Sequence, residues 1–160
     1  MTKIRVGQGY DVHQLEAGRK FWLGGIEISH TQGAVGHSDA DVLIHVICDA
    51  LLGAANLRDI GYHFPDNDPQ YKQIDSKILL KKVVTLISAS GYQIGNVDVT
   101  VSLQTPKISK YIPDMIKCLS GVMKTEENNI SIKATTTERL GFVGREEGVS
   151  ALAVVLIYKS

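Results

Sequence analysis

The sequence predicts a single-domain α/β (α+β) sandwich over residues 1–160, with a mixed or antiparallel sheet and helices packed on one face. Alternating apolar residues predict strands at 3–10, 97–103 and 130–134. Apolar residues three or four apart predict helices at 41–54, 76–90 and 109–124. No linker or internal repeat divides the chain, whose 160 residues can bury a sizeable core. These elements form two layers most simply when the helices cover the sheet.

The first predicted strand leads into Asp11-Val12-His13. Because residues two apart in an extended segment point the same way, Asp11 and His13 project together. Residues 21–28 predict a short hairpin that turns at Gly24-Gly25, or equally one bulged strand. His30 lies in the polar loop that follows, and we expect it to be exposed and without a role.

The helix at 41–54 begins after a small polar loop, and Ser38 or Asp39 can cap it. Asp41, His45 and Asp49 follow one another at four-residue spacing and share a helical face. An adjacent apolar stripe should face the core: Leu43, Ile47, Ala50, Leu51 and Ala54.

Asp11, His13 and His45 together offer three nitrogen and oxygen ligands and leave a fourth position open. This arrangement is typical of a catalytic rather than a structural zinc site. Asp49, one turn beyond His45, could orient its imidazole. His37, on the loop before the helix, is a candidate for contact with substrate.

The segment at 59–69 is rich in Asp, Asn, Gly and Pro, which predicts a loop with specific turns. It is either a plain connector or a surface that binds hydroxyls or a second cation. The helix at 76–90 begins at Asp75 or Ser76. Its lysines are most simply its solvated face: Lys77, Lys81 and Lys82.

The strand at 97–103 has an apolar face and a polar face that includes Asp98, Thr100, Ser102 and Gln104. The polar face would meet water in a monomer and could line a shared interior in an oligomer. Residues 130–134 run into three threonines and Glu138, a strand end whose hydroxyls could also hold a phosphate. Residues 150–158 are almost wholly apolar and predict a strand buried on both faces.

Composition excludes several classes of protein. The chain has 17 basic and 17 acidic residues, so no overall field favours nucleic acid or an anionic membrane. It shows no targeting segment and no apolar run long enough to span a bilayer, so we expect a cytoplasmic protein. Cys48 and Cys118 are isolated and read as small core residues in a reducing compartment.

Five blocks of sequence, in order, carry a resemblance that covers essentially the whole chain: residues 9–13, 37–45, 59–61 with 64–68, 134–138 and 141–145. Together they closely resemble the 2-C-methyl-D-erythritol 2,4-cyclodiphosphate synthase family of the non-mevalonate isoprenoid pathway. The resemblance implies a homotrimer whose sheets surround a threefold axis, with each active site between two subunits. It implies a lyase that cyclises 4-diphosphocytidyl-2-C-methyl-D-erythritol 2-phosphate and releases CMP.

The resemblance also implies roles for individual residues. Asp11, His13 and His45 would hold a zinc-like divalent ion, and Glu138 would help to hold a second cation such as Mg²⁺ or Mn²⁺. His37 and Thr136 would stabilise the transition state. The remaining implied substrate contacts fall in the metal and loop region, at Val12, Ser38, Asp59, Ile60, Gly61, Phe64, Pro65, Asp66, Asn67 and Asp68.

A second group of implied contacts forms the cytidine pocket of the neighbouring subunit: Leu103, Gln104, Thr105, Pro106, Lys107, Ile108 and Ser109. Thr135, Thr136, Thr137 and Glu138 would engage the diphosphate. Phe142 and Arg145 would lie at the threefold cavity, where family members can hold an isoprenoid diphosphate. Two residues depart from the family pattern: Ala40, where Gly is usual, and Leu103, where a smaller residue is common.

The chemistry suits this residue set. The 2-phosphate attacks the β-phosphorus of the same molecule, so cations and positioning do the work and no protein nucleophile is needed. One alternative is a zinc phosphoesterase that activates water with the same three ligands. Another is a non-catalytic trimer that senses isoprenoid diphosphates through Phe142 and Arg145. A third is an ordinary domain with scattered structural histidines, which the ordered blocks argue against.

Overall fold

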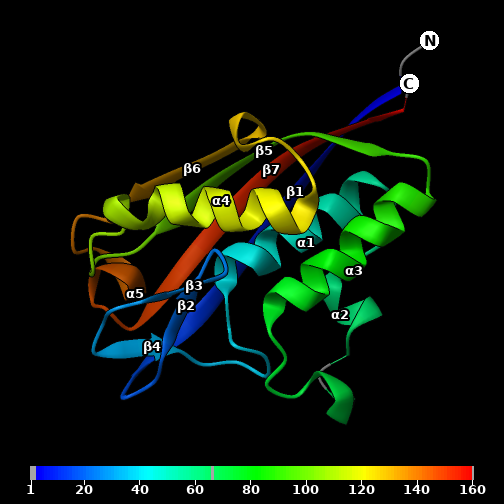
Figure 1. Ribbon diagram of the computed structural model, residues 1–160. Helices are drawn as coiled ribbons and strands as arrows, with labels where there is room; N and C mark the ends of the chain where they lie inside the picture. The colour runs from blue at the N-terminus through cyan, green and yellow to red at the C-terminus, as the bar shows by residue number, and fades with distance from the viewer. Residues whose placement is uncertain (1–2, 66, 160) are drawn as a thin grey trace.

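Five strands form one mixed sheet in the order β4-β1-β7-β5-β6 in the computed structural model, which describes residues 3–65 and 67–159 (Figure 1). The strands are β1 (Lys3–Ala17), β4 (Gln32–Ala34), β5 (Gln93–Ser102), β6 (Ile130–Thr135) and β7 (Gly148–Lys159). β5 and β6 run parallel, and every other neighbouring pair is antiparallel. The predicted mixed sheet is therefore confirmed, and the first strand is longer than expected because β7 pairs along it as far as Gln14.

The long helices α1 (Val42–Ala54), α3 (Ser76–Ala89) and α4 (Ile112–Met123) cover one face of this sheet (Figure 1). The short helices are α2 (Ile60–His63) and α5 (Gly141–Gly144), and 3₁₀ turns lie at Pro69–Tyr71, Ser109–Tyr111 and Glu127–Asn129. The predicted hairpin is confirmed as β2 (Phe21–Leu23) and β3 (Ile26–Ile28), which turn at Gly24 and Gly25. The arrangement is the predicted two-layer α/β fold with helices on one side.

α1 packs directly on the backbone of β1. A Cβ atom on Gly7 would lie 2.0 Å from the carbonyl oxygen of Ala50, and one on Gly9 would lie 2.1 Å from that of Val46. The two glycines point to the same side of the strand as Asp11 and His13. They therefore set how closely α1, which carries His45, approaches the strand that carries the other two predicted ligands.

α1 begins differently from the prediction. Its cap is Asp41, not Ser38 or Asp39, and the Asp41 carboxylate accepts the backbone N–H of Ile44. Ala40 has φ of 58°, in the left-handed region that favours glycine. Position 40, where glycine is usual in the family that the sequence resembles, is therefore not helical.

The second face of the sheet carries no helix among the described residues. We call it the open sheet face; it includes Ile4, Val6 and Tyr10 of β1, which are 60%, 64% and 59% exposed. Val154 of β7, also on this face, is 39% exposed, so the prediction that this strand is buried on both sides is wrong for one chain. Its backbone is paired on both edges, but its outward side chains are partly exposed in the described part of the chain.

Two smaller expectations also differ from the structure. His30 is half-buried beside Phe21, and its Nε2 is enclosed without a hydrogen-bond partner among the described residues. Lys77 is not simply solvated, because its Nζ pairs with Asp75 at 2.9 Å and donates to the carbonyl oxygen of Gly25. Cys48 is fully buried as predicted, and burial raises the pKa of its thiol well above the usual value.

Candidate active site

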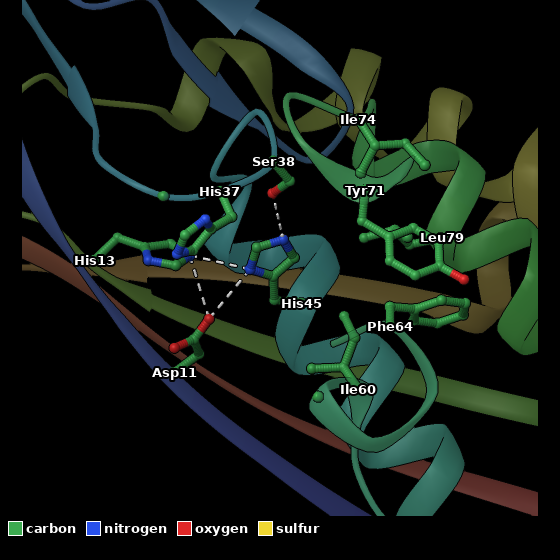
Figure 2. Close-up of a pocket in the computed structure, with 12 residues that line it drawn as sticks. Asp11, His13, His37, Ser38, His45, Ile60, Phe64, Tyr71, Ile74 and Leu79 are labelled. Atoms are coloured by element: carbon green, nitrogen blue, oxygen red, sulfur yellow. Dashed lines mark hydrogen bonds and ion pairs between the residues drawn. The ribbon is translucent and has the colours of Figure 1, made fainter. Parts of the chain in front are cut away.

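Asp11, His13 and His45 converge where β1 passes α1 (Figure 2). His13 Nε2 lies 3.0 Å from His45 Nδ1, and Asp11 Oδ2 lies 3.3 Å from each of these nitrogens. Tetrahedral zinc bonds of about 2.0–2.2 Å put neighbouring ligand atoms roughly 3.3 Å apart. This triangle therefore fits a divalent metal ion, as the sequence predicts, and leaves one side open.

The protonation of this cluster also suits a metal. Burial raises the pKa of Asp11, but the hydrogen bond with His45 and the charge of His13 outweigh it, and the net pKa is lowered. Burial lowers the pKa of His13, against the opposing effect of Asp11. An ionised carboxylate and a neutral imidazole are the forms that bind metals.

The outer nitrogen of His45 faces two hydroxyl groups. Its Nε2 lies 3.1 Å from Ser38 Oγ and 3.1 Å from Ser76 Oγ. Ser76 is fully buried at the start of α3, and the sequence predicted for it only a place at the start of this helix. Its position seven residues beyond the turn-rich loop at 59–69 gave no local sign that it would reach His45.

Neither carboxylate that shares the predicted face of α1 is among the hydrogen-bond partners of the His45 ring in the described residues. Asp41 is fully buried and accepts the backbone N–H groups of Gly24 and Gly25 at 2.9 and 2.7 Å. Asp49 Oδ1 accepts the N–H of Ile60 at 2.7 Å, so the prediction that it orients His45 is wrong. Four-residue spacing placed these groups on one helix, but their partners come from the hairpin and from α2.

A pocket of about 350 Å³ opens beside the triangle. Figure 2 shows its polar end at the triangle, with His37 and Ser38, and its apolar end at Ile60 and Phe64. The sequence missed the other lining residues, which are Gly36, Tyr71, Ile74 and Leu79. The sequence gives no sign that separates these residues from ordinary core and loop residues, so their place in the pocket could not be predicted.

The predicted loop residues divide into two groups. Ile60, Gly61 and Phe64 line the pocket. Asp59 and Asp68 cap short helices, with their carboxylates on the N–H groups of Tyr62 and Gln70. Val12, 38% exposed, Pro65 and Asn67 are not among the lining residues, and Asp66 lies outside the described residues.

A second pocket, of about 210 Å³, lies at the ends of β5 and β6. Its lining residues are Leu103, Gln104, Pro106, Lys107, Ile108, Ser109, Ala134, Thr135 and Thr136. These include almost all of the predicted cytidine contacts, with Thr105 as the exception, and two of the threonines. The two pockets share no lining residue, so one chain holds the predicted site as two separate parts.

The segment after β6 carries the other predicted residues. Thr136 Oγ1 donates to Glu138 Oε1 at 3.1 Å, and the main chain of Glu138 is left-handed with φ of 52°. Thr137 and Glu138 line neither of these pockets. Phe142 is 36% exposed, and Arg145 forms two 3.0 Å hydrogen bonds with Glu147.

The fold and the site define a class of protein: an α/β domain with a cluster of two histidines and one carboxylate that fits a metal ion, beside one pocket, and a separate polar pocket at the end of the sheet. The YgbB family model matches residues 4–158, and the chain belongs to that family. A 2-C-methyl-D-erythritol 2,4-cyclodiphosphate synthase from Bacteroides fragilis (strain YCH46) is 66% identical over 155 residues, 97% of this chain and 98% of the relative.

Solved structures agree with this assignment. IspF from Plasmodium falciparum, in a complex with CDP, superimposes with a TM-score of 0.87 at 38% identity, over 98% of this chain and 97% of that one. The bifunctional IspDF from Campylobacter jejuni gives a TM-score of 0.96 at 39% identity, over 100% of this chain and 43% of the longer one. At these identities the relatives share both fold and family with this chain.

Proposed function

We propose that this protein converts 4-diphosphocytidyl-2-C-methyl-D-erythritol 2-phosphate to 2-C-methyl-D-erythritol 2,4-cyclodiphosphate and CMP, in the isoprenoid pathway that begins without mevalonate. An oxygen of the 2-phosphate forms a bond to the β-phosphorus. The bond from that phosphorus to the bridging oxygen breaks, and CMP leaves with the electron pair. The observation that carries this proposal is the Asp11, His13 and His45 triangle at the polar end of the pocket, in a chain of this family.

The chain's own residues bind and align the substrate. Asp11, His13 and His45 hold a divalent ion, which we propose to be zinc; when bound, it neutralises phosphate charge and polarises the phosphorus. His37 and Ser38 contact the erythritol phosphate, and Ile60, Gly61 and Phe64 enclose the erythritol. Because both reacting groups belong to one molecule, holding it folded supplies much of the acceleration.

The second pocket binds the cytidine diphosphate end. Lys107 and its neighbours hold the nucleotide, while Thr135 and Thr136 hold the diphosphate, with His37 and Thr136 stabilising charge in the transition state. Glu138, in hydrogen-bond contact with Thr136, helps to hold a second ion such as Mg²⁺ or Mn²⁺. The CDP complex of the Plasmodium falciparum relative supports a nucleotide site in this fold.

A homotrimer unites the two pockets. We place the open sheet face around a threefold axis, so that the metal pocket of one subunit meets the cytidine pocket of the next. Two features support this: the pockets are separate in one chain, and apolar side chains of the open sheet face are exposed among the described residues. Phe142 and Arg145 then face the axial cavity, where an isoprenoid diphosphate would compete with Glu147 for Arg145.

Charge and hydropathy bear on other partners and on the compartment. The balanced charge gives no basis for nucleic-acid binding. Among the described residues, no helix is long and apolar enough to cross a membrane. We propose that the reaction takes place in the cytoplasm.

Phosphorus NMR of the purified protein with the diphosphocytidyl substrate tests the reaction. We expect a cyclic diphosphate and CMP, lost when a strong chelator is added and restored by zinc with magnesium. Linear phosphates or inorganic phosphate would instead indicate a zinc phosphoesterase, because hydrolysis consumes water and cyclisation does not. Absence of any product from metal-replete protein would contradict both and favour a binding module.

A further inference from the structure

Asp39 and Ser76 connect the N-termini of α1 and α3 directly behind the predicted metal ligand His45. The Ser76 side chain is fully buried, and its Oγ lies 3.1 Å from His45 Nε2. Asp39 Oδ1 accepts the Ser76 hydroxyl, and Asp39 Oδ2 accepts the Ser76 backbone N–H at 3.0 Å. Both oxygens of one carboxylate are thus engaged by one serine.

The chemistry of donors and acceptors fixes where the protons lie in the hydrogen bonds that join Asp39, Ser76 and His45. An ionised carboxylate only accepts, so the Ser76 hydroxyl proton points to Asp39. Ser76 Oγ can then only accept from His45, which places a proton on Nε2. A neutral imidazole carries one proton, so Nδ1 presents its lone pair to the side where Asp11 and His13 lie.

Ser38 is a weaker candidate for this task. Its Oγ is also 3.1 Å from His45 Nε2, but it sits on the loop beside the pocket and already accepts the N–H of Ala40 at 3.1 Å. In the proposed function Ser38 turns toward a phosphate. Ser76 does not line the pocket, so its contact with His45 persists when substrate binds.

We propose that Asp39 and Ser76 are positioning residues that fix His45 in its Nε2–H tautomer and so keep Nδ1 ready for the metal. The inference rests on the metal role proposed for Asp11, His13 and His45. Partners behind metal-binding histidines typically change metal affinity by about 10–100-fold when removed. Ser76→Ala removes the acceptor with little change in volume, and Asp39→Asn removes the charge that orients the serine.

The test compares these variants with the unaltered protein and with Ser120→Ala. This control removes a half-buried serine hydroxyl in another part of the fold, one that donates to the carbonyl oxygen of Thr125. Zinc affinity is measured by calorimetry against a competing chelator. The His45 tautomer is read from ¹⁵N NMR of chelator-treated, histidine-labelled protein. We expect zinc affinity about 10-fold lower in Ser76→Ala and Asp39→Asn, and a mixed tautomer in place of Nε2–H.

Two results would overturn the proposal. One is unchanged zinc affinity in Ser76→Ala, within the range of Ser120→Ala, together with an intact Nε2–H tautomer. His45 would then remain a proposed metal ligand, but Asp39 and Ser76 would not be its positioning residues. The other is an unaltered protein in which Nδ1 of His45 carries the proton. If His45→Ala bound zinc as tightly as the unaltered protein, the proposed metal role would fail as well. Thermal unfolding of each variant separates a lost tautomer from a lost fold.

Discussion

The backbone of Gly9 lies against the carbonyl oxygen of Val46 so closely that a Cβ atom would approach it to 2.1 Å. This contact fixes the separation between β1 and α1 at Val46, the residue that directly follows His45. The distances of 3.0–3.3 Å within the metal triangle depend on that separation. A glycine with no chemistry of its own thereby helps to define the candidate active site.

Gly9→Ala should therefore damage both stability and metal binding. Because the added methyl must displace α1, we expect a loss of at least about 1–3 kcal/mol in unfolding free energy and weaker zinc binding. Chemical denaturation and calorimetry measure the two effects. Gly53→Ala, on α1, is the control, since nothing lies within 4 Å of its Cβ position. It should raise the free energy of unfolding by about 0.5–1 kcal/mol. Equal behaviour of the two variants would refute the packing argument.

His45→Ala should lower zinc affinity by more than about 100-fold and abolish cyclic product, because it removes one of three ligands. His30→Ala is the matched control, because His30 is also half-buried but lies outside the site. We expect zinc binding and turnover of that variant to be unchanged. Metal analysis and the phosphorus NMR assay give the result, and retained activity in His45→Ala would contradict the site assignment.

Asp49 should give stability a distinct pH dependence. Burial raises its pKa, with Asp11 and Asp59 adding to the rise, while the hydrogen bond from Ile60 opposes it. A raised folded pKa contributes stability below the unfolded pKa of about 3.9, and this contribution is lost as pH rises through the folded value.

The variant Asp49→Asn keeps an acceptor for Ile60 without the charge, so its stability relative to the unaltered protein should rise with pH from about 4 toward neutrality. Denaturation of chelator-treated protein across this range measures the difference. Asp49→Ala, which also loses the hydrogen bond, should be less stable by roughly 1–3 kcal/mol at low pH. If the stability difference between Asp49→Asn and the unaltered protein did not change with pH, or if Asp49→Asn lost much of its zinc affinity, the charge of Asp49 would have another role.

Mixing two inactive variants tests the trimer. If the metal pocket and the cytidine pocket of each site come from different subunits, His45→Ala and Thr136→Ala should complement after joint refolding. Random assembly makes about three quarters of trimers mixed, and each regains one site of three, so about a quarter of normal activity should return. No recovery in a mixture shown to contain mixed trimers would place both pockets in one subunit's site.

The local patterns in the sequence determined much of this result. Alternation in β5 and helical spacing in α3 predicted the elements, and the two-residue spacing of Asp11 and His13 predicted that they point together. The ordered blocks predicted the family that the comparisons establish. These features depend on residues close in the chain, where backbone geometry alone sets which side chains share a face.

Tertiary structure decided which groups those faces meet. The periodicity of α1 put Asp41 and Asp49 beside His45, but Asp41 binds the hairpin turn and Asp49 binds α2. Ser76, far along the chain, reaches the imidazole from α3, beside Ser38 of the nearby loop. A buried polar group forms a hydrogen bond with whichever partner the packing of distant segments brings within about 3 Å. A local sequence pattern does not show which distant residue that will be.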